Sequence, residues 1–341
     1  MSKRVAVLTS GGDAPGMNAC IRAIVIACEH LGYALIGYQH GYNGLINQEY
    51  ESLSLNATHN LIQQGGTILH SARCEAFKSV QGAKDAARNL NTLGIDTLIV
   101  IGGDGSFRGA EHLSQYWPGQ ILGIPGTIDN DVAGCDATVG YYTAIDTAVS
   151  SIDKVRDTAD AFERIFLVEV MGRHAGFLAL NAALASAADY VIVPELFESE
   201  DAELKSIAAQ IEARRQLKGP VSFIVVVAEN VWPGGLSTLA ERLSSQMQSE
   251  VRPVTLGHVQ RGGHDDPGPG VSQAVGEVED RLAVVETGID VCAGDVEELV
   301  GPHGGGQTGN HAAGHLLGRA LYACQSRLVA FLESECHAAD R

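Results

Sequence analysis

No stretch of 18 or more consecutive apolar residues occurs in this sequence, although 45% of its 341 residues are hydrophobic. This absence argues against a membrane-spanning helix. The first residues also lack the charged-then-apolar pattern of a secretory signal, so the sequence predicts a cytoplasmic protein. A chain of this length exceeds what one hydrophobic core usually supports, which favours two lobes.

Cysteine pairs with metal-ligand spacing are missing as well. The seven cysteines are scattered and none belongs to a C-x-x-C pair, so neither a zinc site nor a disulfide framework is indicated. Basic residues are scarce, because 23 Lys and Arg stand against 41 Asp and Glu, a net charge of −18. This charge argues against nucleic acid or an anionic membrane as a partner. A phosphate-bearing ligand would therefore need arginines and lysines that are gathered locally.

Glycine-rich polar turns follow three apolar segments that resemble buried strands. The segments and their turns are residues 5–9 with Gly11–Asn18, residues 97–101 with Gly102–Ser106, and residues 121–124 with Pro125–Asp131. Helical segments alternate with these strands, which predicts an α/β fold with mostly parallel sheets. Ligands of such folds bind at the carboxyl ends of the strands, so we expect the three turns to share one site. A single turn of this composition is weak evidence, because these residues also favour turns for backbone reasons.

The residue types in these turns suit a phosphate ligand. The backbone N–H groups at Gly11 and Gly12 can approach an anion closely, with a helix N-terminus behind them. Gly103 and Gly105 have no side chain to block a nucleotide phosphate, and Asp104 is a hard oxygen ligand of the kind that holds Mg²⁺ beside phosphates. An alternative is that Asp104 only caps the helix expected over residues 105–116.

The second half of the chain repeats the alternation of strands and helices. We expect strands at 164–171, 190–193, 223–228 and 254–256, and helices at 141–160, 176–187 and 200–217. Five basic side chains fall at the ends of these elements: Arg164, Arg173, Arg252, His258 and Arg261. A single arginine is usually a solvated surface charge, but five at strand ends favour a phosphate site.

Five motifs now identify a family resemblance. LTSGGDAPGMNA, GGDGS, PGTIDND, VEVMGRHAG and LGHVQRGG, in this order, resemble the bacterial ATP-dependent 6-phosphofructokinases over about residues 3–263. The resemblance implies two Rossmann-like lobes with mostly parallel sheets. Residues 1–139 would form the nucleotide-binding lobe, with about 252–305 returning to it. Residues 140–251 would form the sugar-phosphate lobe, with a C-terminal helix at about 306–341.

The same resemblance implies a reaction and a set of site residues. The γ-phosphoryl group of ATP, with Mg²⁺ as cofactor, would pass to the 1-hydroxyl of fructose 6-phosphate. Asp129 would be the general base, Thr127 would steady the transferring group, and Arg173 would neutralise its charge. The implied nucleotide site, with Asp104 as the metal-linked residue, is Gly12, Arg73, Cys74, Gly103, Asp104, Gly105 and Ser106. The implied sugar-phosphate site is Thr127, Ile128, Asp129, Arg164, Met171, Gly172, Arg173, Glu229, Arg252, His258, Val259, Gln260 and Arg261.

The resemblance also bears on assembly and on the phosphate donor. Arg164 matches an arginine that reaches the sugar phosphate of a neighbouring subunit, which implies a homotetramer with shared active sites. Gly105 and Gly126 favour ATP, because pyrophosphate-using relatives typically carry Asp and Lys there. Three alternatives stay open: a pyrophosphate-dependent enzyme, a kinase for another sugar phosphate such as tagatose 6-phosphate, and an impaired subunit that regulates a partner.

Two parts of the chain depart from the family pattern. Arg22 remains at the effector site, but Ile26 and residues 51–56 supply no basic group, so we expect a weak or altered response to ADP and phosphoenolpyruvate. Residues 264–341 form a divergent tail with no Lys, and four Arg against thirteen Asp and Glu give it a charge of −9. The tail is either a replacement with helices near 272–287 and 311–333 or the product of a frame shift near 263. His311 and His315 suit a metal site only weakly, because no Cys or carboxylate joins them at ligand spacing.

Overall fold

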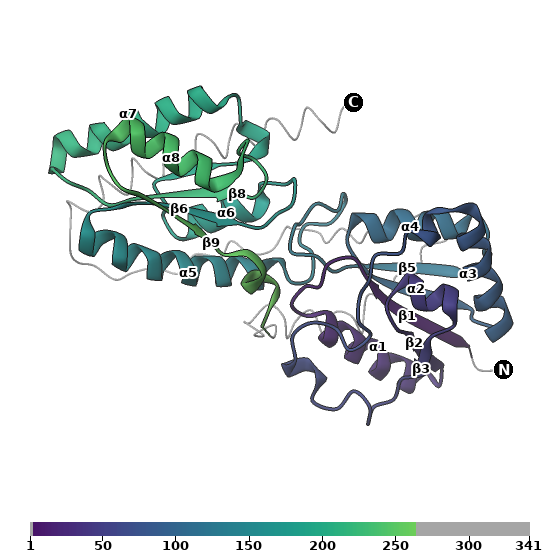
Figure 1. Ribbon diagram of the computed structural model, residues 1–341. Coiled ribbons are helices and arrows are strands. Elements are labelled where there is room, and N and C mark those ends of the chain that lie inside the picture. The colour runs from purple at the N-terminus through teal and green to yellow at the C-terminus, as the bar shows by residue number, and fades with distance from the viewer. Residues whose placement is uncertain (1–2, 264–341) are drawn as a thin grey trace. The chain divides into compact units, whose positions relative to one another are not determined.

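The computed structural model describes residues 3–263, which divide into two compact units (Figure 1). The first unit contains residues 3–144 and 261–263, and the second contains residues 145–260. The expected return to the first lobe near residue 252 is too early, because strand β9 (Val251–Thr255) pairs with β6 in the second sheet. The expectations for the tail helices, the lobe segments beyond 263 and His311 and His315 lie outside the described residues.

The sheet of the first unit has the strand order β3-β2-β1-β4-β5. Its strands are β1 (Arg4–Ser10), β2 (Ala34–Tyr38), β3 (Tyr50–Ser52), β4 (Thr97–Gly102) and β5 (Gln120–Pro125). All neighbouring strands are parallel except β2 and β3, which are antiparallel. The chain builds outward from β1 on one side and then from β4 on the other. The strand order therefore reverses between β1 and β4, which is the position where α/β sheets bind ligands.

Helices cover both faces of this sheet. They are α1 (Met17–Leu31), α2 (Tyr42–Asn47), α3 (Val80–Leu93) and α4 (Asp104–Ser114), with short 3₁₀ helices at Leu61–Gln63 and Ala76–Lys78. Side chains of α2, α3 and α4 share one buried cluster with Leu8 of β1 and Leu98 of β4. Because strand side chains alternate, Val7 and Ile101 face the opposite side, where α1 buries Met17. Both faces are thus apolar, as expected for parallel strands.

The second unit has a fully parallel sheet in the order β7-β8-β6-β9. Its strands are β6 (Ile165–Val170), β7 (Tyr190–Ile192), β8 (Phe223–Ala228) and β9. Its helices are α5 (Tyr141–Phe162), which starts in the first unit, α6 (Phe177–Ala185), α7 (Glu200–Lys218) and α8 (Gly235–Met247), with 3₁₀ helices at Pro194–Leu196 and Gly257–Arg261. Apolar residues of α7 and α8 share one core with β6, β7 and β8.

Local capping fixes where several helices begin and end. The hydroxyl of Ser79 accepts a 3.0 Å hydrogen bond from the Gly82 N–H, which caps the start of α3. Gly94 ends α3 with a left-handed backbone, φ 61°. Ser199 caps α7 in the same way through the N–H of Ala202, at 3.2 Å. These residues set the boundaries of the helices that lead to and from the sheet edges.

The predicted α/β class with mostly parallel sheets is confirmed. Two short elements of the first unit, α2 and the antiparallel edge strand β3, were not predicted, and neither was α8. The alternative in which Asp104 is a helix cap is wrong, because Gly103 occupies the N-cap position and Asp104 is the first helical residue of α4. Among residues 3–263, no helix is long and apolar enough to cross a membrane.

Candidate active site

The turn after β5 holds the predicted general base. Asp129 is only 6% exposed, and its backbone N–H donates a 3.2 Å hydrogen bond to the hydroxyl oxygen of Thr127. The Thr127 carbonyl in turn accepts a hydrogen bond from the Thr138 hydroxyl. Ile128, a predicted substrate-contact residue between Thr127 and Asp129, is fully buried. The turn is therefore a fixed loop that presents a carboxylate and a hydroxyl at the end of β5.

The neighbouring turn after β4 carries the glycines predicted for the nucleotide. A Cβ atom placed on Gly103 would lie 3.4 Å from Cβ of Thr127, so the two turns touch. The N–H of Gly126 also donates to the carbonyl of Gly102 at 2.9 Å. A Cβ atom on Gly105 would meet nothing within 4 Å. The described protein atoms thus leave open space beside Gly105.

Asp104, the predicted metal-linked residue, stands in the first turn of α4. Its carboxylate pairs with Nε of Arg108 at 2.9 Å, and its side chain is 42% exposed. A helix N-terminus favours a carboxylate there and leaves backbone N–H groups for an anion. Residues 3–263 contain no cluster of three or more His, Cys, Asp or Glu that could hold a metal ion. A metal at Asp104 would therefore need ligand oxygens from a bound phosphate.

The first turn, after β1, is held by side chains from several loops. The hydroxyl of Ser71 donates a 2.5 Å hydrogen bond to the Gly11 carbonyl, and Nη1 of Arg261 donates a 2.8 Å hydrogen bond to the carbonyl of Asp13. The predicted nucleotide residues Arg73 and Cys74 follow Ser71 in the same loop. Arg73 is exposed, whereas Cys74 is half-buried against the core of the first unit. Ser106, the last predicted nucleotide residue, is buried.

The second unit collects the predicted sugar residues at the end of β6. One oxygen of Glu229 accepts hydrogen bonds from the N–H groups of Gly172, at 3.1 Å, and Arg173, at 2.5 Å. The Met171 N–H donates to Oε1 of the buried Gln260 at 3.4 Å. Glu229 and Gln260, from different segments, therefore hold the turn at residues 171–173.

A carboxylate that the sequence did not single out lies between two predicted phosphate-binding arginines. Glu250 pairs with Nε of Arg164 at 3.1 Å, and its other oxygen pairs with Arg252. The guanidinium of Arg164 also stacks over the Phe162 ring, 4.4 Å from the centroid. Glu250 stands two residues before Arg252 and just ahead of strand β9, so its nearness in sequence to a predicted site residue is the signal that could have found it.

Each unit assembles its own group of predicted residues. The first unit brings together the three glycine-rich turns and Arg261, and the second brings Met171, Gly172, Arg173, Glu229 and Gln260 to one strand end. His258 and Val259, in the 3₁₀ helix Gly257–Arg261, are exposed.

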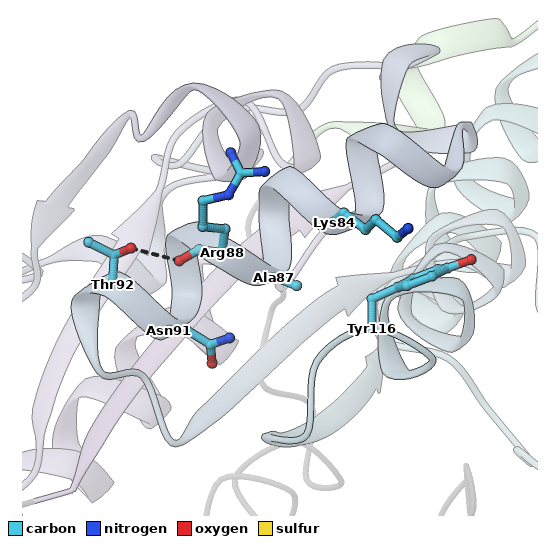
Figure 2. A pocket seen from close by; sticks show the side chains of 6 residues that line it. All are labelled: Lys84, Ala87, Arg88, Asn91, Thr92 and Tyr116. Carbon is cyan, nitrogen blue, oxygen red and sulfur yellow. Dashed lines mark hydrogen bonds between the residues drawn. The ribbon is translucent and has the colours of Figure 1, made fainter.

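A separate groove lies along α3 (Figure 2), with a volume of about 540 Å³. Its lining residues are Lys84, Ala87, Arg88, Asn91, Thr92 and Tyr116. The ammonium of Lys84 stands 5.8 Å from the centroid of the Tyr116 ring. None of the predicted site residues lines this groove, so it plays no part in the site described above.

The sheet topology defines an α/β protein with three glycine-rich turns at one sheet edge, and comparison with known proteins supplies the family. The phosphofructokinase family model matches residues 4–268. ATP-dependent 6-phosphofructokinase 1 of Thermus thermophilus is 48% identical over 261 residues, 76% of this chain and 80% of the relative. The enzyme of Staphylococcus carnosus is 49% identical over 262 residues, 76% of this chain and 79% of its own. The chain belongs to the phosphofructokinase family, whose named members are phosphotransferases.

Solved structures agree with this assignment. The phosphofructokinase of Saccharomyces cerevisiae superimposes with a TM-score of 0.74 at 32% identity, over 84% of this chain and 42% of the yeast chain. This chain thus spans less than half of that longer protein. A pyrophosphate-dependent phosphofructokinase of Marinobacter aquaeolei superimposes with a TM-score of 0.67 at 22% identity, over 80% of this chain and 73% of its own, which shows a shared fold.

Proposed function

We propose that this chain is an ATP-dependent 6-phosphofructokinase that transfers the γ-phosphoryl group of ATP to the 1-hydroxyl of fructose 6-phosphate. The products are fructose 1,6-bisphosphate and ADP. The observation that carries the proposal is the buried Asp129, whose N–H is held by Thr127, which itself lies against Gly103 at the edge of the first sheet. The family membership and the printed activity of its relatives support it.

The reacting groups have distinct roles in this proposal. Asp129 accepts the proton of the attacking hydroxyl, for which an ionised carboxylate within hydrogen-bond reach is sufficient. Thr127 orients the transferred group, and Arg173 stabilises the charge that develops on it. Phosphoryl transfer depends on positioning and charge stabilisation more than on covalent chemistry. A base, an orienting hydroxyl and a cation are therefore the kinds of group that the reaction needs.

Two glycines support ATP as the donor. The space beside Gly105 is open to a nucleotide, because a side chain there would meet no described atom within 4 Å. At Gly126 a Cβ atom would lie 2.9 Å from Cγ2 of Ile101 and 3.3 Å from Cε of Met17, so a larger residue would force the core to repack. Gly105 thus leaves room for ATP, and Gly126 keeps the neighbouring turn closely packed on the sheet.

The residues present fit Mg²⁺ as a cofactor held mainly by the nucleotide. Magnesium in such sites takes one or two protein carboxylates together with phosphate oxygens and water, and Asp104 supplies one partly exposed carboxylate. Arg108 would have to share or release Asp104 when the metal binds. Once bound, the ion would neutralise charge on the phosphates.

Assembly and location stay predictions that follow from the family resemblance. We propose a homotetramer in which Arg164 reaches the sugar phosphate of a neighbouring subunit, and a cytoplasmic location. Sedimentation equilibrium would give the mass of the assembly, and mixing an Arg164→Ala variant with an Asp129→Asn variant would restore part of the activity if active sites are shared.

The decisive experiment measures product formation by the purified full chain. One reaction contains MgATP and fructose 6-phosphate and is scored by ADP, and a second contains pyrophosphate and is scored by fructose bisphosphate. Product with ATP alone supports the proposal, whereas product with pyrophosphate alone contradicts the assignment of the donor. No product with either donor, in a protein that still binds nucleotide, would favour a regulatory subunit. Tagatose 6-phosphate in a third reaction tests the sugar.

A further inference from the structure

Arg261 lies against the first glycine-rich turn, 248 residues away in the sequence. Its Nη1 donates a 2.8 Å hydrogen bond to the carbonyl of Asp13. This is the single hydrogen bond of the Arg261 side chain recorded within residues 3–263. Both residues belong to the first unit, although the preceding residue, Gln260, is anchored in the second unit by Met171.

The guanidinium also covers the Cα atom of Gly12. A Cβ atom on Gly12 would collide with Nη1 and stand 3.0 Å from Cζ and 3.3 Å from Nη2. Only this close approach requires glycine at position 12, because Gly12 does not adopt the left-handed backbone of its neighbour Gly11, φ 89°. The guanidinium of Arg261 therefore packs, with Nη1 nearest, against the peptide backbone that is predicted to face the nucleotide.

The residues after Arg261 rest on a second loop of the same unit. A Cβ atom on Gly65 would lie 2.6 Å from the carbonyl oxygen of Gly263. The buried Asn18, at the start of α1, fixes that loop by donating to the carbonyls of Gln64 and Gly65, at 2.9 and 3.1 Å, and by accepting from the Ile68 N–H at 2.8 Å. Residues 261–263 thus lie on two loops that are each fixed to the sheet edge.

We propose that Arg261 is a positioning residue for the nucleotide: it holds the Gly11–Asp13 turn in the shape that accepts the phosphates. The inference rests on the proposed function and extends it, because the family resemblance gives Arg261 a contact with the sugar phosphate only. A guanidinium is a rigid planar fork with five N–H donors, so it can hold a backbone carbonyl with Nη1 and still offer donors on its other edges. In a chain of net charge −18 it also places positive charge beside the turn.

The test measures nucleotide binding with no sugar phosphate present. Titration calorimetry gives the dissociation constant of MgADP for the native full chain and for Arg261→Ala. We expect at least fivefold weaker binding in the variant. Arg88→Ala is the matched control, because Arg88 is an exposed arginine of the same unit that pairs with Asp85 on α3, and we expect its MgADP affinity to be unchanged. Arg252→Ala should raise the KM for fructose 6-phosphate and leave MgADP binding unchanged.

Gly12→Ala tests the contact from the other side. The added methyl group would displace the guanidinium, so MgADP binding should weaken as in Arg261→Ala. The double variant should bind MgADP no more weakly than whichever single variant binds it less tightly. Arg261→Lys keeps the charge but lacks the planar fork, and it replaces Arg261→Ala if that variant does not fold. We expect its affinity for MgADP to be at least threefold lower than that of the native chain. Thermal unfolding of each variant checks that the fold is intact.

An unchanged MgADP affinity in a folded Arg261 variant, together with a higher KM for fructose 6-phosphate, would overturn the inference and leave the proposed function standing. If the losses of MgADP binding free energy in Gly12→Ala and Arg261→Ala add up fully in the double variant, the inference is overturned as well, since the two changes then act independently. Absence of MgADP binding by the native chain would instead refute the proposed function, and the inference with it.

Discussion

The carboxylate of Glu229 accepts a 2.5 Å hydrogen bond from the backbone N–H of Arg173. Arg173 is in a left-handed backbone conformation, φ 59°, which is unfavourable for a residue with a side chain. The same oxygen of Glu229 also accepts from the Gly172 N–H. The carboxylate therefore offsets the cost of the turn that presents the Arg173 side chain, so a residue predicted to bind sugar also has a structural role.

This relationship predicts different outcomes for two substitutions of Glu229. Glu229→Ala leaves two N–H groups without their acceptor and should lower the free energy of unfolding by about 1–3 kcal/mol. Glu229→Gln keeps a carbonyl acceptor and should lose less than half of that amount. Urea unfolding followed by circular dichroism measures both values. Equal losses in the two variants would mean that the charge, rather than the acceptor, stabilises the turn.

Asp129→Asn tests the general base. The amide keeps the shape of the side chain but cannot accept the proton, so we expect kcat to fall by about 10²–10⁴-fold with little change in the KM for fructose 6-phosphate. Asp136→Asn is the control, because Asp136 is an exposed carboxylate of the same loop that we assign no role. Initial rates with MgATP decide the matter. Activity within tenfold of the native enzyme in Asp129→Asn would show that another group takes the proton.

Several elements could be predicted from sequence to the residue. The helix at Val80–Leu93 is bounded by a Ser cap and a C-terminal Gly, and the strand at Phe223–Ala228 is apolar throughout because both faces of a central strand are buried. Strand β9 was predicted to begin at 254, three residues late. It is an edge strand with exposed Arg252 and Pro253, so its sequence lacks the apolar pattern of a buried strand.

Part of the candidate site could be predicted from the sequence for a similar reason. Turns such as Thr127–Asp129 follow strands whose apolar character is evident, and parallel topology then places their ends on one edge. Contacts between distant segments leave no such local pattern. Glu250 meets Arg164 across 86 positions, and Arg261 meets Gly12 across 249, so both relationships required the folded chain.

The pairing of Glu250 with Arg164 and Arg252 predicts an effect on substrate affinity. A carboxylate that pairs with both guanidinium groups would compete with the sugar phosphate that we propose they bind, and Glu250→Gln removes one negative charge from the cluster. Exposed ion pairs are worth about 0–1 kcal/mol, so the KM for fructose 6-phosphate should fall by up to about fivefold while kcat stays unchanged. The difference should shrink as the salt concentration rises. A higher KM would mean that Glu250 aligns the arginines instead of competing for them.

Glu169, in β6, predicts a dependence of stability on pH. Burial, followed by the nearby negative charge of Glu229, raises the pKa of Glu169 above its ordinary value of 4.5, and a hydrogen bond from Thr255 partly opposes the rise. The native state therefore holds this proton more tightly than the unfolded chain. The resulting stabilisation is complete below the ordinary value, and it is lost as the pH rises through the pKa of the folded state.

Glu169→Gln removes this titration, because its amide stays neutral at every pH. Urea unfolding of the native chain and the variant between pH 4 and pH 8 measures the difference in stability. Relative to the native chain, the variant should become more stable as the pH rises and then reach a plateau above the pKa of the folded state. The cause is the cost of a half-buried charge beside Glu229, which the native protein bears only once Glu169 is ionised. Two curves that stay parallel over the whole range would show that the pKa of Glu169 is the same in both states.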